Sequence, residues 1–74
     1  MRKAIVMVKI GHSYIQTRRD RPVLAMMRLW LMSHGMKHRL IPTVENDDMM
    51  QLSLCMSCYI SVVACDEALM ASDG

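Results

Sequence analysis

One stretch constrains what this chain can fold into: residues 21–34, RPVLAMMRLWLMSH, followed by Gly35. It predicts a helix, because Asp20 can act as the N-cap and Pro22 falls near the first helical position, where a missing N–H is harmless. Gly35 can adopt the left-handed conformation that ends a helix. Between Pro22 and Gly35 the only charged residue is Arg28. A surface helix keeps one face polar, so this helix predicts apolar surface that the fold must cover.

The chain is short for its apolar content. Its 74 residues predict a single small domain, 1–74, yet 53% of them are hydrophobic and the mean hydropathy is +0.17. A chain of this size buries only about 60% of its unfolded surface, so apolar groups are expected at its boundary. We therefore expect a homodimer or an obligate partner. Ten of the residues are Met and none is Phe, which suits either a soft core or an adaptable interface.

The remaining N-terminal segments predict a small sheet. Residues 3–10, KAIVMVKI, read as a strand whose two sides are both apolar in the middle, so we expect both to be covered. Gly11 and His12 then lead either into a second strand at 13–17, which makes a hairpin, or into a loop over 11–20. Residues 40–44 predict an edge strand, because Pro42 cannot donate to a central ladder.

The segment from Met49 to Cys65 carries no charge and is ambiguous. We expect one or two helical turns from Asp47 to about Leu54, capped by Asn46 or Asp47. A strand over 57–64 and a short helix over 66–71 would follow; a single helix over 47–71 is the alternative. At about 25 Å the charge-free run is too short to cross a membrane. The predicted fold is α+β: β(β)αβ with an additional C-terminal helix or strand, its central helix packed on a small sheet.

Cysteine and histidine spacing suggests two kinds of site. His34 and His38, followed by Cys55 and Cys58, could supply four zinc ligands. Gly35 separates the two histidines, however, and an extended chain would point the two thiols to opposite sides of a sheet. Cys55-Met-Ser-Cys58 is also a C-x-x-C sequence, but within an apolar segment burial would raise the thiol pKa values and disfavour redox chemistry. No metal or other cofactor is therefore predicted.

A set of basic residues brackets the central helix. Together with a strand, a helix and a second helical segment, it loosely resembles the ribbon–helix–helix repressors, whose paired strands enter the major groove of DNA. That resemblance implies base contacts from Lys3 and Lys9, with which Met7 between them fits poorly. The net charge of +2 is weak support for nucleic acid. The basic set is Arg18, Arg19, Arg21, Arg28, Lys37, His38 and Arg39.

The sequence carries no nucleophile–base constellation and no phosphate-binding loop, so no catalytic residue and no enzyme activity are predicted. We expect a regulatory or inhibitory protein that docks onto a macromolecule, with apolar anchors from the helix and steering by arginines. Small modulators, many of them phage-encoded, share this size class. A protein partner is expected, nucleic acid is the alternative, and a membrane is not expected. Three Cys without a secretory signal predict a reducing, cytoplasmic location. The predicted partner-binding residues are Arg18, Arg19, Arg21, Met26, Met27, Arg28, Trp30, Leu31, Lys37 and Arg39.

Overall fold

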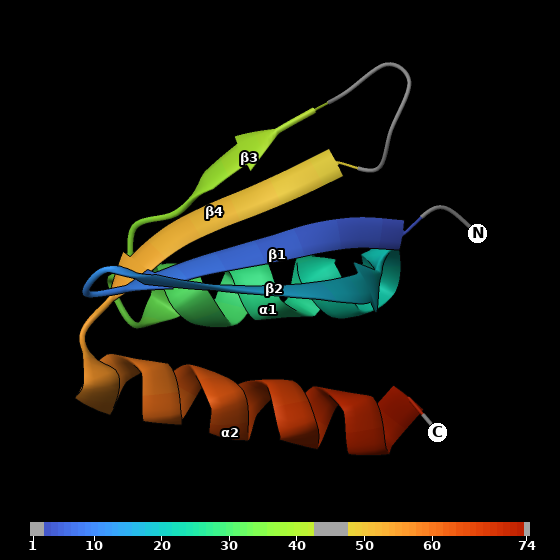
Figure 1. Ribbon diagram of the computed structural model, residues 1–74. Coiled ribbons are helices and arrows are strands. Elements are labelled where there is room, and N and C mark those ends of the chain that lie inside the picture. The colour runs from blue at the N-terminus through green and yellow to red at the C-terminus, as the bar shows by residue number, and fades with distance from the viewer. Residues whose placement is uncertain (1–2, 43–47, 74) are drawn as a thin grey trace.

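The computed structural model describes residues 3–42 and 48–73, which form an α+β fold with one mixed sheet and two helices (Figure 1). This confirms the fold class predicted from the sequence. In chain order the elements are β1 (Lys3–Ile10), β2 (Ser13–Asp20), α1 (Arg21–Ser33), β3 (Arg39–Ile41), β4 (Asp48–Leu54) and α2 (Met56–Asp73).

The four strands lie in the order β2-β1-β4-β3. β1 pairs antiparallel with β2 and parallel with β4, while β3 pairs antiparallel with β4. The first two strands form a hairpin, one of the two alternatives for residues 11–20, and Gly11 takes a positive φ of 59° in its turn. β2 is longer than the predicted 13–17, because Arg18, Arg19 and Asp20 also pair with β1. β3 lies at the edge of the sheet, as Pro42 indicated; residues 43 and 44 of that prediction lie outside the described residues.

The core forms between one face of the sheet and the two helices. Alternate residues of β1, namely Ala4, Val6 and Val8, are buried together with Met27 and Leu31 of α1. Val62 of α2, together with Met50 and Leu52 of β4, completes the cluster. Figure 1 shows α1 and α2 running next to each other along the sheet. Because both helices pack on the same face, the opposite face of the sheet carries no helix.

The ends of α1 follow the sequence signals with one exception. Asp20 occupies the N-cap position, but its side chain makes no capping hydrogen bond. Its carboxylate instead lies 3.7 Å from Lys3 Nζ on the neighbouring strand, so the predicted capping role is wrong. At the other end the helix stops at His34, and Gly35 has a φ of 67°. The prediction for Gly35 is confirmed.

The C-terminal third reverses the predicted assignment. Residues predicted as helical turns form the strand β4, and the predicted strand over 57–64 lies inside the 18-residue helix α2. The period-two pattern of this segment does form a strand. β4 lies between β1 and β3, and its alternate residues Met50 and Leu52 are buried in the core. The alternative of one helix over 47–71 is correct only from Met56 onward. The predicted caps Asn46 and Asp47 lie outside the described residues. Within residues 3–42 and 48–73, no helix is long and apolar enough to span a membrane.

Candidate functional site

The candidate site lies on the sheet face that the helices leave open. Because Ala4, Val6 and Val8 face the helices, the intervening side chains of β1 project from the other face. Ile5 and Met7 remain half-exposed there. The sequence predicted that the middle of both faces would be covered; the structure covers only one with helices, so this prediction is wrong.

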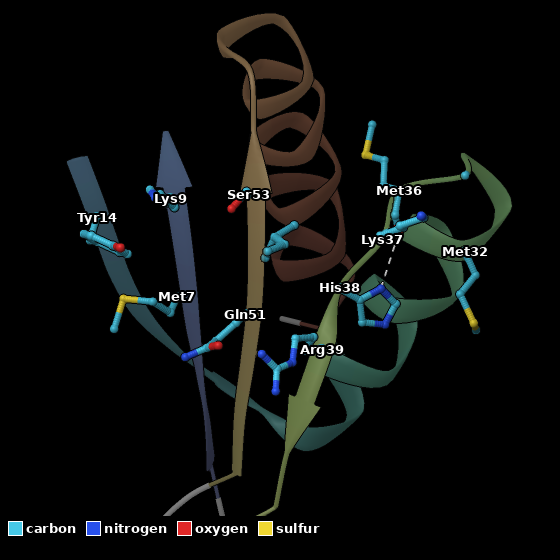
Figure 2. Close-up of a pocket in the computed structure, with 12 residues that line it drawn as sticks. Met7, Lys9, Tyr14, Met32, Met36, Lys37, His38, Arg39, Gln51 and Ser53 are labelled. Carbon is cyan, nitrogen blue, oxygen red and sulfur yellow. Dashed lines mark hydrogen bonds between the residues drawn. The ribbon is translucent and has the colours of Figure 1, made fainter. Parts of the chain in front are cut away.

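A groove of about 970 Å³ lies at one end of the open face, which we call the basic groove (Figure 2). Its floor comes from the four strands, and its wall comes from the end of α1 and the linker to β3. The residues that line it are Met7, Lys9, Tyr14, Met32, Gly35, Met36, Lys37, His38, Arg39, Gln51, Leu52 and Ser53.

Strand register places the floor residues in cross-strand rows. Lys9 pairs with Tyr14 on one side and with Ser53 on the other, which makes one row. Lys9 Nζ lies 5.8 Å from the centroid of the Tyr14 ring, within the range of a cation–π contact. The next row contains Gln51 of β4, which pairs with Met7 and with Arg39. Side chains in such rows are near enough to contact one ligand together.

The wall of the groove is held by hydrogen bonds at the end of α1. The Met36 amide donates to the Leu31 carbonyl at 2.9 Å, which folds the linker back onto the helix. Arg28 Nε then donates to His38 Nε2 at 3.2 Å. When Nε2 accepts, the ring proton resides on Nδ1, which faces the Met36 carbonyl at 3.4 Å. Figure 2 shows Lys37 on the linker between Met36 and His38, close to the end of α1.

The basic groove differs from the rest of the described chain in its balance of charged side chains. Among the described residues that line it, the groove contains the cations Lys9, Lys37 and Arg39 and no carboxylate. Elsewhere, cations and carboxylates form ion pairs: Lys3 with Asp20, Arg19 with Asp66, and Arg21 with Asp48. Among the described residues no carboxylate pairs with a groove cation, so the groove is a region of positive potential that favours an anionic ligand.

The structure distributes the predicted partner-binding residues over several environments. Lys37 and Arg39 lie in the basic groove. Met27 and Leu31 are 2% and 0% exposed, so they are core residues and cannot be the surface anchors that were predicted.

Arg19 and Arg21 bind carboxylates of other elements of the fold. Arg19 binds Asp66 through two hydrogen bonds of 2.9 and 2.6 Å, and this interaction raises its pKa. Arg21 binds Asp48 at 2.6 Å. Both side chains join elements of the fold, which differs from the predicted role of partner contacts.

The other predicted residues lie outside the groove. Arg18 is exposed on β2, and Met26 is exposed on α1. Arg28 supports His38, as described above. Trp30 packs against the core and stacks on the His34 ring with centroids 4.0 Å apart. The predicted set therefore does not form one continuous surface.

Several groove residues were not predicted, notably Met7, Lys9, Tyr14, Gln51 and Ser53. A signal for them exists in the sequence. Lys9 and Met7 share one side of the strand 3–10, and Gln51 and Ser53 share the polar side of a period-two pattern. Assigning that pattern to a strand next to β1 would have brought the two sides together.

The suggested zinc ligands are not brought together. His34 stacks on Trp30, His38 bonds to Arg28, and Cys55 and Cys58 lie at the start of α2. No group of three or more His, Cys, Asp or Glu side chains that could hold a metal occurs among the described residues. The hypothesis of a zinc site from these four residues is therefore not supported.

Comparison of the chain with protein-family models, with curated proteins and with solved structures finds no match.

Proposed function

We propose that this chain is a small non-enzymatic binding protein that docks onto an acidic surface of a protein partner through the basic groove. The observation that carries the proposal is the unbalanced charge of the groove, with three cations and no carboxylate among its lining residues. An acidic surface would replace water around Lys9, Lys37 and Arg39 and would complement their charge.

The apolar lining favours a protein over a nucleic acid. Met7, Met32 and Met36 line the groove together with the Tyr14 ring. Methionine side chains are flexible and adapt to apolar groups of varied shape, which suits contact with protein side chains next to an acidic patch. Tyr, Met and Arg are also enriched in protein interfaces.

Docking would act by steric occlusion, or by holding the partner in one conformation. The floor of the groove is built on paired strands, so its cross-strand rows are fixed before binding. A preformed surface loses little conformational entropy on association. The long cations at the rim would set the orientation and the rate of encounter.

The test measures binding of a fluorescent glutamate-rich peptide by anisotropy. The double variant Lys37→Gln, Arg39→Gln is expected to bind at least about tenfold more weakly than the parent protein, because it removes two of the groove's three cations. Both side chains are exposed, so the circular dichroism spectrum should be unchanged.

The matched control is Arg18→Gln, which neutralises an exposed arginine on the same sheet face but outside the groove. It should change the affinity less than about threefold. If the control lost half as much affinity as the double variant on a logarithmic scale, one charge against two, only net charge would matter and the groove proposal would be wrong.

One observation favours nucleic acid as a second candidate. The Tyr14 ring is 65% exposed and lies beside Lys9, so a base could stack on it while the ammonium contacts a phosphate. The test is a labelled single-stranded oligonucleotide in the same assay. Tight binding that falls steeply with salt and is lost in Tyr14→Ala would support this candidate over the acidic protein.

The ribbon–helix–helix arrangement does not account for such binding. In those repressors one strand of each chain pairs with its copy. Here β1 is flanked on both sides by β2 and β4 of its own chain, so it cannot form an intermolecular ribbon.

A further inference from the structure

The C-x-x-C sequence lies at a junction that the sequence did not predict. β4 ends at Leu54 and α2 begins at Met56, so Cys55 joins a strand to the start of an 18-residue helix. The Tyr59 amide donates to the Cys55 carbonyl at 2.9 Å, which makes Cys55 the N-cap. Cys58 is then the third residue of the helix, within one turn of Cys55. The extended conformation considered for residues 55–58 is therefore not the one found, and Cys58 lies in a helix where a strand over 57–64 was predicted.

The Cys55 sulfur occupies the position of a capping acceptor. Ser57 and Cys58 follow Cys55 in the first turn of α2, on the side of the helix where its amides are unpaired. The Ser57 hydroxyl lies 3.2 Å from the same sulfur. Hydrogen bonding by the Ser57 hydroxyl, and then by Cys58, stabilises a negative charge on this sulfur and lowers the pKa of Cys55 to about 7.

The three cysteines differ in exposure and in thiol pKa. Cys55 is exposed, whereas Cys58 and Cys65 are half-buried. The pKa of Cys58 is raised because its thiol donates to Cys55 and because a negative Cys55 repels a second thiolate. Burial raises the pKa of Cys65. Cys55 therefore ionises first, and the neighbouring Cys58 stays protonated at a pH at which Cys55 is a thiolate.

We propose that Cys55 and Cys58 form a redox-active dithiol that exchanges with accessible disulfides, with Cys55 as the attacking thiol and Cys58 as the resolving thiol. Cys55 precedes the helix as its N-cap and Cys58 is its third residue, which is the C-x-x-C arrangement of redox-active dithiols. This inference does not depend on the proposed function of the basic groove.

The exchange with a disulfide proceeds in two steps. The Cys55 thiolate attacks one sulfur of a disulfide RS–SR′, so the S–S bond breaks, R′S⁻ leaves, and a Cys55–S–S–R mixed disulfide forms. Cys58 then loses its proton to solvent and attacks the Cys55 sulfur. RS⁻ leaves and the Cys55–Cys58 disulfide forms. The dithiol loses two electrons, and the substrate disulfide gains them and becomes two thiols.

The test uses glutathione disulfide and the full chain carrying Cys65→Ser, with products followed by mass spectrometry. The protein should lose two hydrogen masses while two glutathione thiols are released. Adding Cys58→Ser should stop the reaction at a mixed disulfide on Cys55. Adding Cys55→Ser should abolish the rapid reaction, and circular dichroism should show that each variant is folded.

A second measurement distinguishes an activated thiol from any exposed cysteine. The rate of Cys55 alkylation by iodoacetamide should be half-maximal near pH 7 and fall about tenfold per pH unit below that. Ser57→Ala removes one donor to the sulfur, so the midpoint should move to higher pH. An alkylation midpoint near that of a free thiol, about 8.5, would overturn the proposal. Failure of glutathione disulfide to produce the Cys55–Cys58 disulfide would also overturn it.

Discussion

At the scale of single residues, Arg19 is a basic side chain that stabilises the fold. Its guanidinium binds both oxygens of Asp66 and also donates to the Arg18 carbonyl at 2.7 Å. The pair joins β2 at the edge of the sheet to α2, and the two side chains are only 20% and 17% exposed. A bidentate pair in such a position is stronger than an exposed ion pair.

We predict that Asp66→Ala lowers the free energy of unfolding by about 1–3 kcal/mol, because it leaves a half-buried guanidinium without its carboxylate. Urea denaturation followed by circular dichroism measures the change. Glu67→Ala is the matched control, since Glu67 is the exposed neighbour of Asp66 on α2 and should change stability by less than about 0.5 kcal/mol. Equal effects of the two substitutions would contradict a structural role for the pair.

The sequence could not assign Arg19 to this role. Arg18 and Arg19 are identical in type and adjacent, and only strand register decides which one faces the helices. Arg19 pairs with Ala4, the fully buried residue of β1, and therefore lies on the helix side. From the sequence, residues 11–20 could form either a hairpin or a loop. The alternation of side chains along a strand therefore could not be used to assign Arg18 and Arg19 to opposite faces.

At the scale of elements, the end of α1 positions the wall of the basic groove. Gly35 takes a φ of 67°, and the chain then turns so that Met36 bonds back to Leu31. A Cβ added at Gly35 would have no atom within 4 Å, so crowding is not the reason for glycine here. The backbone conformation is the reason, since L-residues other than Asn and Asp adopt it with difficulty.

We predict that Gly35→Ala lowers the free energy of unfolding by about 1 kcal/mol, through strain in the left-handed conformation alone. Gly35→Asn should cost clearly less, since asparagine tolerates that conformation. Thermal and urea denaturation of both variants would measure the difference. An Asn variant as unstable as the Ala variant would show that strain is not the cause.

The contrast between α1 and the last two elements shows what local sequence determines. The helix over 21–34 was predicted because proline, strong helix formers and glycine all mark the same boundaries. The junction between β4 and α2 has no such marker, since its N-cap is Cys55 rather than Ser, Thr, Asp or Asn. The uncharged run could therefore be divided at several points. Pairing of β4 with two neighbouring strands, a tertiary effect, determines where the strand ends.

At the scale of the whole molecule, part of the excess of apolar side chains predicted from composition is exposed on the outer surface of α1. Met26 and Leu29 are 52% and 57% exposed, and the exposed residues Pro22 and Ala25 lie on the same face of the helix. None of these four residues is charged. The basic groove, by contrast, would bring like charges together if two copies met there.

We propose that two copies of the chain pair through this uncharged face of α1. In a twofold dimer the same surface of the two copies is in contact. A face without charged residues can therefore pair with its copy without electrostatic repulsion. Sedimentation equilibrium of the parent protein is expected to show a mass that rises from monomer to dimer with concentration. The double variant Met26→Glu, Leu29→Glu should remain monomeric over the same range, because it places carboxylates opposite one another. Ile60→Glu on α2 is the control: Ile60 is 63% exposed but belongs to a different helix, so its substitution should leave dimerisation unchanged. A parent protein that stays monomeric at the highest concentration would show that α1 does not mediate self-association.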